Sequence, residues 1–366
     1  MSTMRAHEEF AGVPRAGRPA GVRDHVLVMP SVICSALVSE AIADAVPGTI
    51  AVPHDHGCAQ IGGDKDQTRR TLLNVAANPN VAGVVLVGLG CETLTSETLR
   101  EDVDVPVRQL SIQGTGSTEA TIEAGIASAA SLVESESSDR SPADLAELTI
   151  GIAASDFAAS TREQAAPVVG SAVDRLVDAG CRVLIAGLEP LRHHHDKFDT
   201  LTASTAVTDQ LTACIEDRTT GSGNPRLSRQ TEAVSIDEVC GLWGQRPIVD
   251  VLAYGEAAAH DRGVAILDAP TAFEEAATGL VAGGAQLIVH ATAAGIPTGH
   301  PVSPVISVTG DAETAAVMGR DLDLDATAAA PADLLELVTA VAGGKQVAAE
   351  RHGLAPFAIS RAGPSL

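Results

Sequence analysis

Apolar runs of strand length alternate with amphipathic helical stretches along most of this chain. "HVLVMPSVIC" begins at His25, "GTIAVPH" at Gly48 and "VAGVVLVGLG" at Val81, and each is apolar enough to be buried on both faces. Helical patterns separate them, among them "SALVSEAIADAV", for which Ser35 is the predicted N-cap. This alternation predicts parallel β-sheets joined by crossover helices.

The same alternation resumes after a polar interruption. "SESSDRSPADLAE", at residues 135–147, is rich in Ser, Asp and Pro and predicts a domain boundary. The apolar runs "LTIGIAASD", "CRVLIAGLE", "GVAILDAP" and "AQLIVHATAAG" follow it. We therefore predict an N-terminal arm over 1–24, a first α/β domain over 25–137 and a second α/β region over 148–366. Within that region, we expect helix plus loop over 192–230 and an amphipathic helix or helix pair over 331–353.

Composition refines this picture of the fold. The chain has 366 residues, its apolar content comes mostly from Ala, Val, Leu and Gly, and aromatic residues make up only 2%. Such a chain builds a small-residue aliphatic core, which suits α/β layers better than a β-sandwich. The predicted fold class is therefore α/β, with Rossmann-like parallel-sheet units in two or three layers.

Charge and cysteine content exclude several functional classes. The formal net charge is −23 and the chain has only three lysines, so a basic face for nucleic acid is not expected. An acidic, lysine-poor surface is typical of proteins from concentrated salt, which predicts a halophilic source. The six cysteines form no CxxC pair, and no run of eighteen apolar residues exists. We therefore expect free thiols and a cytoplasmic protein with no membrane segment.

The stretch "VPHDHGCAQIGGDKDQ" gathers the most chemistry directly after a predicted strand. Alternate side chains of an extended segment share one face, so His54, His56 and Cys58 can point the same way. Imidazole and thiolate are ligands for Fe²⁺, Zn²⁺ or Mn²⁺, and a carboxylate from Asp64 favours the harder ions. A solvated turn between two buried strands is the alternative interpretation.

Three other strand ends carry weaker signals. "GLGCE" offers backbone N–H groups with Cys91 and Glu92, although a Gly-rich turn after a strand is common. Asp156 in "AASD" can act as a ligand or base, or can cap the next helix. Gly295 in "HATAAGIPTGHP" fits a loop that approaches a ligand, or a plain turn. Ligands of parallel sheets bind at the carboxyl ends of strands, which is where these segments lie.

Several of these segments together resemble the altronate/galactarate dehydratase family, a group that includes the sulfolactate sulfo-lyase large subunit. The likeness is carried by "GVRDHVLVMPSVICS", "AVPHDHGCAQIGGD", "VAGVVLVGLGCE", "VPVRQLSIQ", "VDVLAYGE" and "LDAPTAFEEAATGLVAGGAQLIVHATAAG". It extends from about residue 12 to the end of the chain. The first quarter holds its most specific motifs.

This resemblance implies a hydro-lyase that dehydrates a sugar acid to a 2-keto-3-deoxy acid with a divalent metal, Fe²⁺ or Mn²⁺. It implies the following roles. His54, His56 and Cys58 are expected to hold the metal, with His54, His56, Glu92 and Asp156 in catalysis. Gln60, Asp64, Cys91, Ser155 and Gly295 are expected to contact the substrate. A separately encoded small subunit, like the N-terminal domain of relatives, and homo-oligomers are expected partners.

The chain departs from the family pattern in its second half. Where relatives read Cys-Gly-Gly-Ser-Asp, it has "IAASD", which keeps Ser155 and Asp156. "AGLEPL" offers only Glu189 for a glutamate-rich segment, and "ATAAG" replaces a Thr-Thr-Gly-x-Gly loop. Two alternatives therefore stand beside dehydration: a catalytically degenerate member that acts as a binding or scaffolding subunit, and a sulfo-lyase for a sulfonated hydroxy acid.

Overall fold

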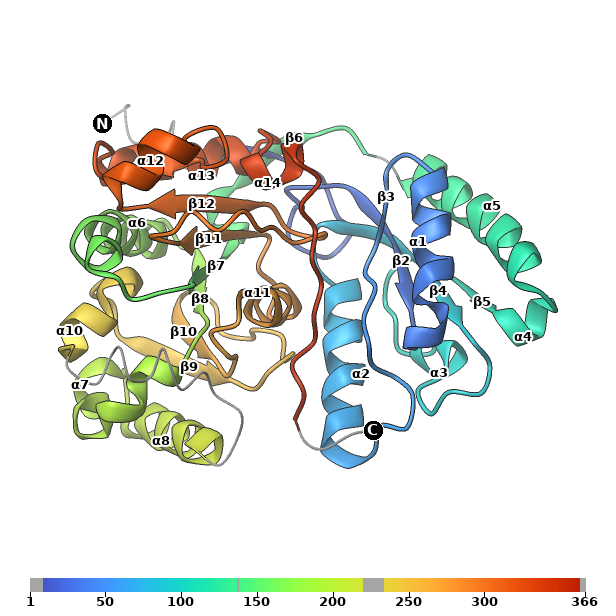
Figure 1. The fold of residues 1–366 in the computed structure, drawn as a ribbon, viewed down its shortest axis with the longest axis horizontal. Helices are drawn as coiled ribbons and strands as arrows, with labels where there is room; N and C mark the ends of the chain where they lie inside the picture. The colour runs from blue at the N-terminus through green and yellow to red at the C-terminus, as the bar shows by residue number, and fades with distance from the viewer. Residues whose placement is uncertain (1–8, 137, 220–233, 363–366) are drawn as a thin grey trace.

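Two parallel β-sheets organise the protein (Figure 1). The computed structural model describes residues 9–136, 138–219 and 234–362. The small sheet has four strands in the order β3-β2-β4-β5, all parallel. Their bounds are Thr49–Ala51 for β3, His25–Pro30 for β2, Val81–Gly88 for β4 and Val107–Ser111 for β5. The predicted strands at His25, Gly48 and Val81 are confirmed.

The large sheet has seven strands in the order β13-β12-β11-β7-β8-β10-β9, again all parallel. Its central strands β7 and β8 come from the predicted runs "LTIGIAASD" and "CRVLIAGLE". The bounds are β7 Thr149–Ala154, β8 Arg182–Ile185, β9 Ile248–Leu252, β10 Gly263–Leu267, β11 Leu287–Ala291, β12 Val305–Thr309 and β13 Leu324–Asp325.

Alternate residues of the small sheet enter two different cores. Val26 and Val28 of β2 pack toward helices α1 (Ala36–Ala45) and α5 (Thr118–Glu136). Leu27 and Met29 point to the opposite face, into a core that the two sheets share. A strand exposes successive side chains on opposite faces, so this continuous apolar run is explained by burial on both.

The shared core also contains two helices that pack against each other, α2 (Gly62–Ala76) and α11 (Phe273–Ala282). The far face of the large sheet is covered by helices that include α6 (Ala166–Asp178) and α13 (Pro331–Ala342). Each sheet is thus the middle of three layers, as the predicted α/β class requires. The helical layer between the sheets is common to both units, which joins them into one α/β/α/β/α stack (Figure 1).

Shorter elements complete the chain. Strands β1 (Glu9–Gly12) and β6 (Ser141–Asp144) form an antiparallel ribbon between the N-terminal arm and the segment that links the two units. The other α-helices of the described residues are α3 Ser96–Arg100, α4 Ile112–Thr115, α7 Phe198–Leu201, α8 Thr205–Thr219, α10 Ile236–Val239, α12 Ala312–Met318 and α14 Ala348–Arg351. Helices α13 and α14 are the predicted pair. The part of the 192–230 prediction that falls on 220–233 lies outside the described residues.

One local prediction needs correction. Ser35 precedes α1 but makes no capping bond; its buried hydroxyl donates instead to the carbonyls of Val32 and Val87, which tie the helix start to β4. Helix α2 begins at Gly62 and therefore includes Asp64 in its first turn. No helix of the described part of the chain is long and apolar enough to cross a membrane.

Candidate functional site

The loops that follow β2, β3 and β4 meet at the carboxyl end of the small sheet. The His54 ring Nε2 donates to the Pro30 carbonyl at 2.8 Å, and the backbone N–H of Ile33 donates to the His56 carbonyl at 2.9 Å. The Ser31 hydroxyl donates to the Glu92 carboxylate at 2.8 Å. The sheet therefore brings the "HDHGC" and "GLGCE" motifs together, as the parallel topology predicts.

His54 and His56 are buried neighbours whose tautomers follow from their partners. A carbonyl can only accept, so Nε2 of each ring carries the proton: His54 donates to Pro30, and His56 donates to the Ile359 carbonyl at 3.0 Å. Each Nδ1 then accepts, from the His56 backbone N–H at 3.2 Å and from the Gln60 amide at 2.9 Å. Burial lowers the pKa of His54 to about 4, so its imidazole is neutral at pH 7.

Gln60 connects the histidines to the start of α2. Its side-chain amide donates to the Asp64 carboxylate at 2.7 Å, and its carbonyl oxygen accepts from the Gly57 backbone N–H at 3.0 Å. Gln60 is 2% exposed, and Asp64 and Thr68 beside it are also buried. We call His54, His56, Gln60, Asp64 and Thr68 the histidine cluster. Its hydrogen bonds are supplied from within the protein.

The C-terminal segment 355–362 completes this cluster from the other end of the chain. Figure 1 shows it running between the two units toward the base of α2. Besides the Ile359 carbonyl on His56, the Ala362 backbone N–H donates to Asp64 at 3.0 Å, and the Gln67 amide donates to the Ser360 carbonyl at 2.6 Å. Nothing in the pattern of residues 355–362 indicated this role, because their partners lie about 300 positions away.

The predicted metal ligands do not share a face. Gly57 has φ +96° and Ala59 has φ +56°, so the chain turns between His56 and Cys58 and leaves the thiol exposed. The only ring nitrogen of each histidine with a lone pair to offer is Nδ1, and here both accept a protein N–H. No group of three or more His, Cys, Asp or Glu residues in the described ranges is placed to hold a metal ion. In this arrangement the residues do not fit Fe²⁺ or Mn²⁺.

Glu92 is held as a carboxylate beside the histidine cluster. Burial by itself raises the pKa of Glu92, but hydrogen bonds from backbone N–H groups, including that of Gly90 at 2.6 Å, and from Ser31 outweigh it and lower that pKa. The "GLGCE" turn thus supplies backbone N–H groups, as predicted, but it directs them at its own glutamate. Cys91 beside it is exposed.

A second polar group lies at the carboxyl end of the large sheet. The Ser155 hydroxyl, one residue past β7, lies 2.5 Å from Nε2 of His290 on the neighbouring strand β11. Burial lowers the pKa of His290 to about 3, which keeps this imidazole neutral. Asp156 accepts from the Ala158 backbone N–H, the Thr161 hydroxyl and the Ala293 backbone N–H, the last at 2.8 Å. These bonds tie the loops after β7 and β11 together, and the helical segment that follows, Thr161–Ala165, has no side-chain cap, so Asp156 does not fill the predicted capping role.

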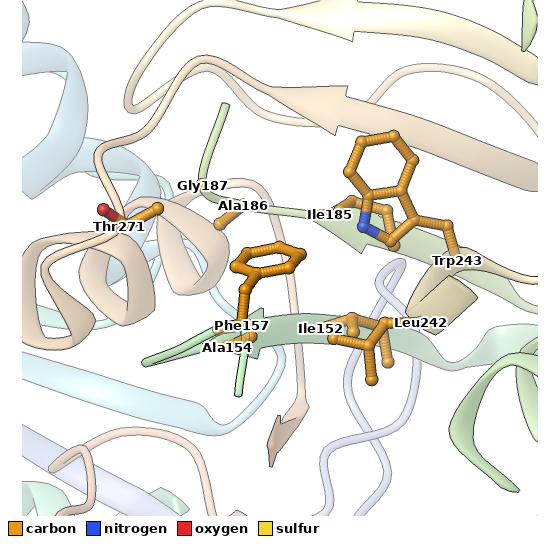
Figure 2. Close-up of a pocket in the computed structure, with 10 residues that line it drawn as sticks. Ile152, Ala154, Phe157, Ile185, Ala186, Gly187, Leu242, Trp243 and Thr271 are labelled. Carbon is orange, nitrogen blue, oxygen red and sulfur yellow. The ribbon is translucent and has the colours of Figure 1, made fainter. Parts of the chain in front are cut away.

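A pocket opens between the ends of β7 and β8 (Figure 2). Phe157, Leu242 and Trp243 lie around the strand ends, and Ile185, Gly187 and Thr271 complete much of the wall. Pockets at this end of a parallel sheet are the usual place for ligands. Gly295, the last of the predicted substrate contacts, has φ +62° and packs against α12 rather than in this wall.

Comparisons with known proteins agree with this architecture. The model of the second domain of D-galactarate dehydratase/altronate hydrolase matches residues 12–137, which hold the small sheet. The C-terminal model of D-galactarate/altronate dehydratase matches residues 242–365. The chain belongs to the galactarate/altronate dehydratase family. The members of this family that it resembles are named as lyases, and the chain is a lyase of that group.

Relatives match nearly the whole chain at low identity. A (2R)-sulfolactate sulfo-lyase subunit beta from Chromohalobacter salexigens is 27% identical, with 96% of this chain and 97% of the relative covered. Altronate dehydratases from Bacillus subtilis and Escherichia coli are 26% and 27% identical, with 98% and 96% of this chain covered. The match covers 78% and 77% of these two enzymes.

For this dehydratase-family chain, the sequence motifs missed His290 and the pocket residues Trp243 and Thr271. His290 stands inside an apolar run, where a lone histidine is most often a satisfied core residue. Trp243 is the only tryptophan of the chain and Thr271 follows β10, but neither stands in a recognisable motif. Only their positions, at a strand end or in a loop next to β7 and β8, could have indicated a functional role.

Proposed function

We propose that this chain is a hydro-lyase that removes water from a polyhydroxylated sugar acid and releases a 2-keto-3-deoxy acid. The observation that supports the proposal is the pair of family matches over 12–137 and 242–365, together with relatives named altronate dehydratase and galactarate dehydratase. Dehydration of this kind removes the proton on C2, breaks the C3–O bond and adds a proton to the departing hydroxyl. The resulting enol then becomes the keto acid.

The reaction needs a base at C2 and an acid at the leaving oxygen. We assign substrate contact to Ser155 and Asp156 at the carboxyl end of the large sheet, with His290 as the group that exchanges a proton with the Ser155 hydroxyl. Glu92 is a further candidate base, because its carboxylate is ionised. His54 and His56 receive no acid–base role, since all four ring nitrogens are engaged by the protein.

A requirement for Fe²⁺ or Mn²⁺ follows from the family resemblance, and no step above depends on it. Metal analysis of the purified protein, followed by titration with Fe²⁺ and Mn²⁺ under argon, tests the requirement directly. Binding of either ion at a stoichiometric level would mean that the histidine cluster rearranges, because its lone pairs are occupied in the present arrangement.

The decisive assay measures 2-keto acid released from altronate, galactarate, gluconate and galactonate, with and without added Fe²⁺ or Mn²⁺. We expect turnover of at least one of these acids, and loss of at least 100-fold in kcat for Ser155→Ala, because a proton-transfer group contributes about 10²–10⁴-fold. No keto acid from any of them, in the presence of bound metal, would favour the degenerate binding subunit instead.

A sulfo-lyase is the second candidate, and one observation favours it. The match to the sulfo-lyase subunit covers 97% of that relative, whereas about a fifth of each altronate dehydratase lies outside the match. The chemistry is the same except that sulfite leaves from C3 in place of hydroxide. Sulfite and keto acid released in equal amounts from a sulfonated 2-hydroxy acid, with no turnover of aldonates or aldarates, would establish it.

A partner subunit is proposed on the same comparison, because the fully covered relative is named a subunit beta. Native mass spectrometry of the chain purified from its own source tests for a small partner and for homo-oligomers. A monomer that turns over a sugar acid unaided would contradict both expectations.

A further inference from the structure

Buried polar atoms without a hydrogen-bond partner gather at one end of the large sheet. In the described part of the chain, nine such side-chain atoms occur; five of them follow β8, β10 or β11, and a sixth belongs to the next-to-last residue of β11. They belong to Glu189, His194, Thr271, His290 and Thr298. The other three belong to Arg182, in the first position of β8, and to His260, which precedes β10.

Glu189 is the most unusual member of this group. It stands four residues past the end of β8, is 1% exposed, and neither carboxylate oxygen has a partner. A buried acidic group is normally paired or hydrogen-bonded, because removing it from water without compensation is costly. The histidine cluster obeys that rule, with partners for every ring nitrogen. Glu189 does not, which indicates that its partner is a molecule outside the chain.

Among the residues with unpartnered atoms, Thr271 lines the pocket of Figure 2, and Glu189 is near it in sequence without being part of its lining. Glu189 follows Gly187 by two residues, and Thr271, which is 8% exposed with an unpartnered hydroxyl, lies in the pocket wall itself. The strands β11, β7, β8 and β10 are consecutive neighbours, and adjacent strands are about 4.8 Å apart. His290 lies in β11, and Ser155, Glu189 and Thr271 follow β7, β8 and β10, so all four residues belong to the carboxyl edge of the large sheet.

The chemistry of this edge matches one class of ligand. A carboxylate that lacks donors accepts hydrogen bonds from hydroxyl groups, and threonine hydroxyls donate to or accept from them. The rings of Phe157 and Trp243 offer apolar surface to the C–H groups of the same molecule. We propose that the carboxyl end of the large sheet binds a polyhydroxylated carboxylic acid, with Glu189 and Thr271 holding its hydroxyl groups. This inference rests on the proposed function and assigns its substrate to these residues.

Trp243, the only tryptophan, makes the test direct. Its fluorescence is titrated with galactarate, galactonate and gluconate, and with adipate, which has the galactarate carbon chain and both carboxylates but no hydroxyl groups. We expect a saturable change with at least one hydroxylated acid and none with adipate at equal concentration. Saturation by adipate with the same Kd, or no saturation by any hydroxylated acid, would overturn the assignment.

Two variants then locate the binding groups. Glu189→Gln and Thr271→Val should each raise Kd at least tenfold, whereas Glu119→Gln, an exposed residue of α5, should leave Kd within twofold. Because the Glu189 carboxylate has no partner in the free protein, we also expect Glu189→Gln to keep or raise the Tm measured without ligand. A lower Tm with unchanged Kd would show a structural role and refute the assignment.

Failure of this site and failure of the proposed reaction give different results. If wild-type protein releases keto acid while Glu189→Gln binds and turns over normally, the reaction stands and the site is elsewhere. If galactarate binds in a Glu189-dependent way but no keto acid forms, the site stands and the chain is a binding subunit.

Discussion

Replacing Gln60 by alanine tests whether the histidine cluster is scaffold or substrate site. The substitution removes the acceptor of the Gly57 N–H and the amide that donates to His56 and to Asp64. Gln60 is 2% exposed, so at least three buried polar atoms lose a partner. Each buried hydrogen bond that is lost contributes about 1 kcal/mol. We therefore expect the free energy of unfolding to fall by at least about 3 kcal/mol.

The change should be visible in both heat and urea unfolding. At about 2–4 °C of Tm per kcal/mol for chains of this size class, the expected loss in Tm is roughly 6–12 °C. Gln113→Ala is the matched control: this glutamine is exposed, and its backbone N–H donates to the Leu89 carbonyl, a bond that the substitution keeps. The control should stay within about 0.5 kcal/mol of wild type.

The kinetic constants decide between the two roles. A scaffold role predicts that the folded fraction of the Gln60→Ala protein keeps a KM close to wild type. A loss of stability below about 1 kcal/mol, combined with a clear rise in KM for the sugar acid, would refute our reasoning and restore Gln60 as a substrate contact.

Three further predictions concern pH, backbone strain and the C-terminal segment. His54 and His290 have pKa values of about 4 and about 3 in the folded protein, below the ordinary 6.5. Between pH 6.5 and these lower values, the unfolded chain therefore binds more protons than the folded chain. Stability should be full above about pH 6.5 and fall as pH drops toward 4, by up to about 1.4 kcal/mol per pH unit for each histidine; a urea midpoint equal at pH 7 and pH 5 would contradict this. Gly57→Ala should destabilise by more than about 1 kcal/mol, since φ is +96° and the new methyl carbon would lie 2.3 Å from the Ser31 carbonyl oxygen. Gly63→Ala, in open space within α2, should be neutral or stabilising by up to about 1 kcal/mol, and equal Tm shifts for the two variants would count against the strain. Ile359→Ala removes a side chain that is 3% exposed in the shared core and should cost about 2–5 kcal/mol; a smaller loss, with no increase in proteolysis of the C-terminus, would show that residues 355–362 do not hold the two units together.

Much of the fold follows from the local pattern. Apolar runs such as that at Val81 form strands buried on both faces, because their alternate residues meet different helical layers. The order of strands along the chain also fixed where the motif loops lie, since parallel strands end at a common edge. What periodicity did not show is that the two sheets share the layer formed by α2 and α11. That sharing depends on which helix faces meet across a core contributed by both halves of the chain.

For the candidate site, the sequence by itself determined which residue types stand at the strand ends, and the tertiary structure decided which of them are left free. His54 and His56 look like ligands in sequence, yet their nitrogens are satisfied by partners that include the carbonyl of Ile359, 303 positions away. Glu189 is all that the sequence keeps of a glutamate-rich segment, yet it is buried without a partner. Whether a polar group is available depends on its hydrogen bonds, and those are formed mainly by residues distant in sequence, which only the folded chain brings together.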